Sequence, residues 1–153
     1  MEYKIIVDIV FLLGILFILH FIYLLILSKQ TSRWLPIESI IDTSELEVTN
    51  QGLGNENSVL YKANVKYQYV IEEKVYFSKR VFIGDYLRKS FPRNAKLIVS
   101  KYKKGETVLA YYNPQRPNKS VLETGIHTAI YSELFVGVFF IVLSVIMWNE
   151  ILK

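Results

Sequence analysis

Residues 5–27 read IIVDIVFLLGILFILHFIYLLIL, an apolar run of 23 residues that only Asp8 and His20 interrupt strongly. As an α-helix the run is about 34 Å long at ~1.5 Å per residue, which is enough to cross a hydrocarbon core of about 30 Å. It is longer than the apolar part of a cleaved signal peptide, and no small-residue cleavage site follows it. The run therefore predicts an uncleaved transmembrane helix, and a buried helix of a soluble protein is the alternative.

A second apolar run, Thr128 to Trp148, reads TAIYSELFVGVFFIVLSVIMW and has Glu133 near its start. Two spans place both termini on one side of the membrane and residues 28–127 on the other. The basic residues near the membrane favour a cytoplasmic domain, but the positive-inside rule is weakest for long loops, so the side stays open. These residues are Lys29, Arg33, Arg116 and Lys119 on the domain side, against Lys4 and Lys153 on the other.

The composition agrees with a small integral membrane protein of the cell (inner) membrane. Of 153 residues, 52% are hydrophobic, which is high for a soluble chain of this length. The absence of cysteine excludes disulfides, thiolate metal sites and a lipidated cysteine. The net charge of +4 is mild and does not by itself indicate nucleic acid.

The clearest pattern between the two apolar runs is alternation. Residues 61–69 read YKANVKYQY, in which tyrosine, alanine and valine alternate with polar residues. Period two is typical of a strand with one buried face. Glu72-Glu73 then predicts a turn, and Val75 to Ile83 predicts the returning strand, which Gly84-Asp85 ends.

The flanking segments predict further strands and one helix. We expect an extended stretch over Ile37–Val48 and, after it, a loop over residues 50–58. Residues 94–102 fit a short helix, although the β-branched pair Ile98-Val99 leaves a strand open. Glu106 to Tyr112 is apolar on both faces from Val108 onward, which predicts a central strand.

The chain then turns once more before the second span. Asn113, Pro114, Arg116 and Pro117 predict a structural turn, and Ser120 to Leu122 a last short strand. The expected fold is a membrane α + β protein with two transmembrane helices, residues 1–28 and 128–153. These flank a small β-rich extramembrane domain, residues 29–127, with five or six strands in a sheet or barrel-like arrangement and one short helix.

Several short motifs follow one another in a characteristic order. They are Trp34-Leu35-Pro36, Ile40-Ile41-Asp42, the strand Tyr61 to Tyr69 with Tyr76-Phe77, Lys101 to Val108 (KYKKGETV), Tyr111 to Pro117 (YYNPQRP), and Ser120 to Glu123 (SVLE). Together they resemble the DUF3592 family of small membrane-anchored bacterial proteins. Glu72-Glu73-Lys74 stands where that family often has a glycine. The resemblance implies a membrane-tethered β domain and no catalytic residues, because the function of the family is unknown.

The sequence offers no constellation typical of an enzyme. The two histidines, His20 and His127, lie far apart, and Gly52 and Gly54 flank only Leu53, with no helix after them to bind phosphate. A nucleophile with a base, paired catalytic carboxylates and metal ligands at workable spacing are not evident. We therefore expect a non-enzymatic protein without a cofactor or metal.

Basic residues gather between residues 79 and 104, where Asp85 is the only acid. Near anionic lipid each basic residue contributes about 1 kcal/mol, so the cluster predicts a lipid-facing surface, with a solvated charged face as the alternative. Nucleic acid is not expected, because no recognition motif accompanies the charge. The nine residues are Lys79, Arg80, Arg88, Lys89, Arg93, Lys96, Lys101, Lys103 and Lys104.

Three ionisable residues lie within the apolar runs. Asp8 and Glu133 are close enough to a membrane surface to reach it, whereas His20 is placed more deeply. Such residues are costly at the bilayer centre and often functional. We expect either a helix-packing or proton-linked role, or a neutral histidine bonded to a neighbouring helix or to interfacial water.

The predicted function is a β-rich binding domain held at the bacterial membrane for protein–protein interaction or homo-oligomer formation. Two alternatives stay open on the sequence alone. One is an immunity protein that neutralises a cognate secreted or membrane-acting toxin, and the other is an accessory subunit of an envelope or sensory complex. The partners expected are membrane lipid and a protein.

Overall fold

The computed structural model describes residues 2–51, 58–88 and 92–151. The chain divides into two compact units. Residues 1–27 and 128–153 form one of them, here called the helical unit. Residues 28–127 form the other, here called the β unit. The predicted tip loop, residues 50–58, falls mostly outside the described residues.

The helical unit consists of two long helices that run antiparallel. Helix α1 spans Glu2–Thr31, its last turn belonging to the β unit, and helix α3 spans Tyr131–Ile151 after a short 3-10 turn, η2, at Thr128–Ile130. Both are apolar on all sides and, by length and composition, both are able to cross a membrane. Phe17 stacks on Phe140 at 5.8 Å between ring centroids, and the Lys4 ammonium lies 5.8 Å from the Trp148 ring.

Two glycines set the distance between these helices. A Cβ at Gly14 would lie 3.0 Å from the Gly137 carbonyl oxygen and 2.7 Å from Ile141 Cγ1. A Cβ at Gly137 would reciprocally lie 3.0 Å from the Gly14 carbonyl oxygen and 2.8 Å from Ile18 Cγ1. The backbones therefore meet at a point where only glycine fits, which is the contact that brings membrane helices close together.

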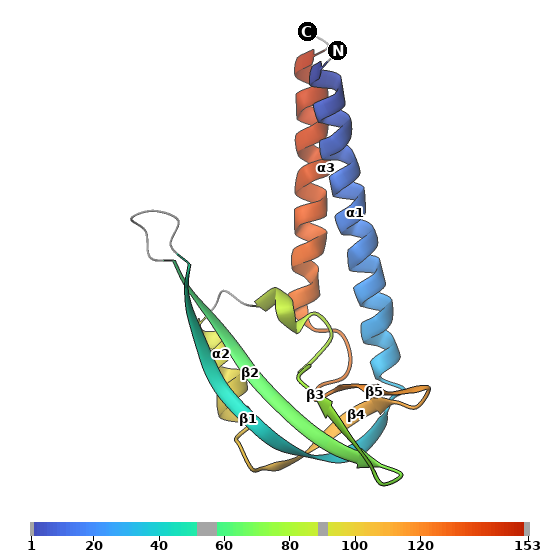
Figure 1. Ribbon diagram of the computed structural model, residues 1–153. Helices are drawn as coiled ribbons and strands as arrows, with labels where there is room; N and C mark the ends of the chain where they lie inside the picture. Colours follow the sequence, from blue (N-terminus) through green and yellow to red (C-terminus); the bar gives the residue numbers. More distant parts are fainter. Residues whose placement is uncertain (1, 52–57, 89–91, 152–153) are drawn as a thin grey trace. The chain divides into compact units, whose positions relative to one another are not determined.

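The β unit is a five-stranded antiparallel sheet with the order β3-β2-β1-β4-β5. The strands are β1 at Leu35–Gln51, β2 at Ser58–Ile71, β3 at Lys74–Ser78, β4 at Thr107–Asn113 and β5 at Arg116–Val121. The described strands form an open sheet, so the barrel-like arrangement is not supported. Strands β1 and β2 are the longest and form the curved hairpin in Figure 1.

Two predicted boundaries were wrong. The returning strand ends at Ser78 rather than Ile83, because the Val81 N–H leaves the sheet and donates to the Asp85 carboxylate at 2.9 Å. The turn after β4 is shorter than expected, because Asn113 pairs with Arg116 across it. Strand β4 is an interior strand, between β1 and β5, but Leu109 is 54% exposed, so it is not buried on both faces.

The helix preferred for residues 94–102 is confirmed as α2, Pro92–Lys101. It contacts β2 and β1, and the Ser44 hydroxyl donates to the Val99 carbonyl at 3.4 Å. A short 3-10 turn, η1, precedes it at Asp85–Arg88. The helix closes one side of the core, in which Ile41, Val65 and Ala95 are buried.

The chain enters and leaves the β unit at one place. The Thr31 hydroxyl donates to the Ser28 carbonyl at 2.7 Å and accepts the Gly125 N–H at 2.8 Å. Gly125 has a φ of 88°, a left-handed conformation that suits glycine. The two ends of the β unit are therefore fastened to each other.

Candidate functional site

The inner face of the sheet is filled by tyrosine side chains whose hydroxyl groups are bonded. The Tyr67 hydroxyl donates to the Arg80 carbonyl and lies 3.0 Å from Ser120 Oγ, and the Tyr69 hydroxyl donates to the Pro117 carbonyl at 2.6 Å. Burial raises the pKa of Tyr67 to about 12 and also raises the pKa of Tyr69. Side chains thus join β5 to β2 across the sheet, in a role that is structural.

A second polar cluster surrounds Glu123, just after β5. Its Oε1 accepts hydrogen bonds from Lys101 Nζ at 2.7 Å and the Tyr102 hydroxyl at 2.8 Å, and His127 Nδ1 lies 3.6 Å from Oε2. The His127 ring stacks on Phe82 at 4.2 Å. Burial opposes the charge on Glu123, but the bonds from Lys101 and Tyr102 outweigh it and lower the pKa of this carboxyl. Burial and the bond to Glu123 raise the pKa of Tyr102. The cluster fastens α2 to the end of the sheet.

The outer face of the sheet carries exposed apolar side chains. Tyr67 and Tyr69 point inward, so Val70 on β2 and its partner Val75 on β3 point outward by alternation. Phe77 pairs with Gln68, which in turn pairs with Ile40 of β1. The exposed residues of this surface, here called the outer apolar face, are Phe77 (69%), Leu109 (54%), Val70 (53%), Val75 (47%) and Ile40 (47%).

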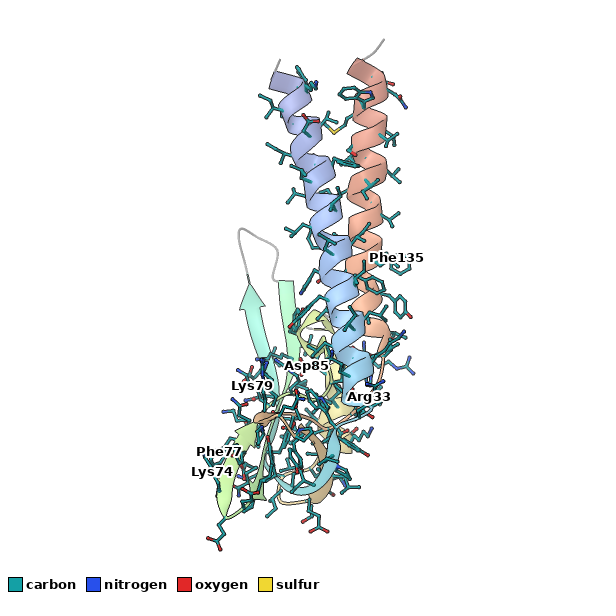
Figure 2. All side chains as sticks on the ribbon, turned by 90° about the vertical axis from the view of Figure 1, so that its right-hand side faces the viewer. Arg33, Lys74, Phe77, Lys79, Asp85 and Phe135 are labelled. Atoms are coloured by element: carbon teal, nitrogen blue, oxygen red, sulfur yellow. The ribbon has the colours of Figure 1, made fainter. Side chains whose placement is uncertain are left out.

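Charged residues border this face at its two ends along the strands, and exposed Glu38 of β1, the cross-strand partner of Leu109, interrupts it. Lys66, one alternation beyond Gln68 on β2, and Lys79, just beyond β3, are exposed at one end. Figure 2 shows Phe77 and Lys79 on the same side of the β unit. Glu72 and Glu73 form the hairpin tip at the other end, where both are exposed.

The described members of the predicted basic cluster come from several elements of the β unit. Arg80 follows β3, Arg93 and Lys96 are exposed on α2, Lys103 and Lys104 precede β4, and Lys101 is bound to Glu123. The Arg88 side chain and Lys89 lie outside the described part of the chain. The lipid-facing surface therefore stays a prediction.

The predicted turn residues lie where the hairpin of β4 and β5 reverses. Asn113 Oδ1 accepts the Gln115 N–H at 2.9 Å, which fixes the reversal at Pro114. Arg116 and Pro117 belong to β5. The segment is structural.

Two of the three ionisable residues within the apolar runs meet. His20 Nδ1 lies 3.2 Å from Glu133 Oε2, and the Glu133 side chain is buried. Beside this pair, Phe21 packs on Tyr131 at 5.6 Å between ring centroids. Asp8 is exposed on α1. The pair fits the expected helix-packing role, since each group gives the other a polar partner.

Within residues 2–51, 58–88 and 92–151, no group of three His, Asp or Glu side chains is placed to hold a metal ion. Sequence reasoning missed the outer apolar face. The signal was the presence of Val70, Val75 and Phe77 at positions that alternate with buried tyrosines.

Comparison with protein families agrees with this architecture. A family model described as "Domain of unknown function (DUF3592)" matches residues 38–127. The chain belongs to this family. The DUF3592 match contains nearly all of the sheet and α2, and it ends at His127, the last residue of the β unit. It includes neither apolar helix. None of the curated proteins compared with this DUF3592 chain matches it.

Proposed function

We propose that the protein is a two-pass membrane protein that holds the β unit at one membrane surface as a non-catalytic module for protein binding. The observation that carries the proposal is the outer apolar face. Five apolar side chains, each at least 47% exposed, lie around exposed Glu38 on a sheet whose opposite face already forms the core. Exposed apolar side chains gathered on one surface among charged residues are typical of an interaction site.

The helical unit supports the membrane part of the proposal. Within the most apolar window of each helix, only 17% of residues in α1 and 22% in α3 are buried in the chain, so neither resembles the core helix of a soluble protein. Leu12, Leu16 and Phe135 project outward with more than 60% of their surface exposed. Lipid is the solvent that accommodates such side chains without a hydrophobic penalty.

The joined ends of the β unit also suit this arrangement. Thr31 and Gly125 are hydrogen-bonded, so the chain reaches and leaves the β unit at adjacent points. The two spans follow directly from these ends in the sequence, at residues 27–28 and 127–128. A unit tethered at both ends in this way presents its sheet without needing an additional anchor.

Protection of the outer apolar face tests the binding function. The chain has no native cysteine, so Phe77→Cys gives a single thiol on the face, and Val48→Cys gives one on the opposite side of the sheet. Maleimide labelling rates are compared between opened membranes and dilute detergent micelles. We expect Phe77→Cys to label several-fold more slowly in membranes and Val48→Cys to label equally in both. Equal rates for Phe77→Cys in both settings would refute the proposal.

A further inference from the structure

We infer that the exposed face of helix α2 binds anionic lipid headgroups at the surface of the membrane that holds the chain. The inference rests on the membrane tether of the proposed function and is independent of the outer apolar face. Three features of the β unit support it: the side chains on the exposed face of α2, the charges around that face, and the bonds that join α2 to the end of the β unit.

Helix α2 has one face on the sheet and one face that is exposed. The inner face contacts β2 and β1, and Ala95 on this face is buried. On the opposite face Leu97 is 58% exposed, one turn after Arg93. A basic helix face that also exposes an apolar side chain is typical of a helix that lies on an anionic membrane surface. The residues of this face, which line an open hollow of about 470 Å³, are Arg93, Lys96, Leu97 and Ser100.

Basic residues outnumber acids around this face. Residues 92–106 contain five basic residues and one acid, Glu106, whose carboxylate accepts the Lys103 N–H at 3.3 Å. Glu45 of β1 points away from α2, because its neighbour Ser44 donates to the Val99 carbonyl and side chains alternate along a strand. The net charge around α2 is therefore positive and complements the phosphates of anionic lipid.

Bonds within the β unit hold α2 close to the point where the chain enters the second apolar helix. Lys101 Nζ, at the end of α2, and the Tyr102 hydroxyl just after it both donate to the Glu123 carboxylate. Glu123 is four residues before His127, the last residue of the β unit, and four residues span at most about 14 Å of extended chain. Leu97 lies one helical turn before Lys101, about 6 Å along the axis. Covalent and hydrogen-bonded distances alone therefore keep the exposed face of α2 near the start of the second span.

The strength of the contact follows from the number of charges. Each basic residue held at an anionic surface strengthens binding about fivefold, and salt weakens this gain because it screens the surface potential. Arg93 and Lys96 together therefore strengthen the contact about 25-fold. The tether keeps α2 at a high effective concentration of lipid, so a contact of this strength forms without a further anchor.

An environment-sensitive fluorophore on the full-length chain tests the inference. The chain has no native cysteine, so Ser100→Cys gives one thiol on the exposed face of α2, and Val70→Cys gives a control thiol on the outer apolar face. Each variant is labelled with a nitrobenzoxadiazole maleimide and placed in nanodiscs of phosphatidylcholine, alone or mixed equally with phosphatidylglycerol.

The two labelled positions should respond differently to anionic lipid. We expect the Ser100→Cys probe to emit about twofold more strongly, and at shorter wavelength, in the anionic nanodiscs. The difference should disappear in about 1 M salt, where the screening length is ~3 Å. The Val70→Cys probe should emit equally in both nanodiscs. An equal response from the two positions would overturn α2 as the face that binds lipid.

Removal of charge then tests which residues make the contact. In the Ser100→Cys background, Arg93→Gln with Lys96→Gln should abolish the difference between the two nanodiscs. Lys66→Gln with Lys79→Gln removes the same charge beside the outer apolar face and should leave the difference unchanged. Equal losses from the two pairs, when circular dichroism shows the sheet retained, would indicate a response to net charge and overturn the inference.

The remaining outcomes separate this inference from the proposed function. If the Ser100→Cys probe emits equally in both nanodiscs while the chain stays in them, the inference fails and the membrane tether stands. If an added RNA oligonucleotide changes the emission in neutral nanodiscs and anionic lipid does not, nucleic acid replaces lipid as the partner and the inference fails. If the chain enters neither kind of nanodisc, the tether and the inference fail together.

Discussion

The tip of the β2–β3 hairpin holds two glutamates in a left-handed conformation. Glu72 has a φ of 48° and Glu73 a φ of 64°, and Ile71 pairs with Lys74 across them, so the loop has two residues. Positive φ at both positions is typical of a type I′ turn, which Asn-Gly adopts with least strain. The hairpin is therefore tight even without a glycine at either position.

The strain predicts that a better turn sequence stabilises the β unit. A residue with a Cβ costs about 1–2 kcal/mol in the left-handed region. Glu72→Asn with Glu73→Gly relieves much of this cost at both positions. The glycine offsets about 0.5–1 kcal/mol of the gain, because it raises the conformational entropy of the unfolded chain. We expect the free energy of unfolding of the β unit to rise by about 1–2 kcal/mol.

Urea denaturation of the full chain in detergent micelles measures this change. The apolar helices satisfy their backbone hydrogen bonds internally and stay folded in the micelle, so the near-ultraviolet circular dichroism of the tyrosines reports on the β unit. Glu45→Gly is the control, because Glu45 lies in strand β1, where glycine is destabilising by about 0.5–1 kcal/mol. A midpoint for the turn variant at or below that of the unaltered chain would refute the reasoning.

Three further predictions concern the helix contact and the polar clusters. Gly14→Ala places a Cβ 3.0 Å from the Gly137 carbonyl oxygen, so we expect a cost of about 1–3 kcal/mol and a lower melting temperature in detergent. Leu16→Ala, at an exposed position, should leave the melting temperature unchanged, and equal effects would contradict the contact. The Tyr67 pKa of about 12 lies above its ordinary value of 10.0, so the neutral phenol favours the folded state fully below pH 10. The free energy of unfolding falls by about 2–3 kcal/mol between pH 10 and pH 12. Tyr67→Phe should not show this fall in unfolding curves measured from pH 10 to pH 12. An alkaline profile like that of the unaltered chain would count against the burial of the Tyr67 hydroxyl. Because the pKa of Glu123 is lowered in the folded chain, its ionised carboxylate stabilises the folded state above about pH 4.5. This stabilisation is lost as the pH falls through the pKa of the folded state. Glu123→Gln should therefore unfold more easily at pH 7 and show a weaker dependence on acid, and equal stability at pH 7 would speak against the cluster.

The elements with a strong local period were predictable from the sequence. The alternation over Tyr61 to Tyr69 identified β2, and the apolar runs identified both long helices. The end of β3 was not predictable, because KVYFSKRVFI continues to read as a strand while the Asp85 carboxylate removes Val81 from it. That bond depends on a turn that the local pattern does not specify.

The features that depend on tertiary contact were predicted least well. Gly14 and Gly137 are solitary in their runs and 123 positions apart, so their contact becomes evident only when the helices are paired. The contact between His20 and Glu133 likewise becomes evident only when the two helices are paired. Phe77 belonged to the predicted returning strand, and only the register with Gln68 shows which face it lies on.

Whether the two helices lie in lipid is the most direct test of a membrane-tethered β unit. Leu12→Cys places one thiol at an outward position of α1, and Lys104→Cys places one on the exposed turn before β4. Each variant is treated with a membrane-impermeant maleimide in membranes opened on both sides. We predict rapid labelling of Lys104→Cys and labelling of Leu12→Cys only after the membrane is dissolved and the chain denatured. Labelling of Leu12→Cys in intact bilayers as fast as Lys104→Cys would place α1 in water and contradict the account.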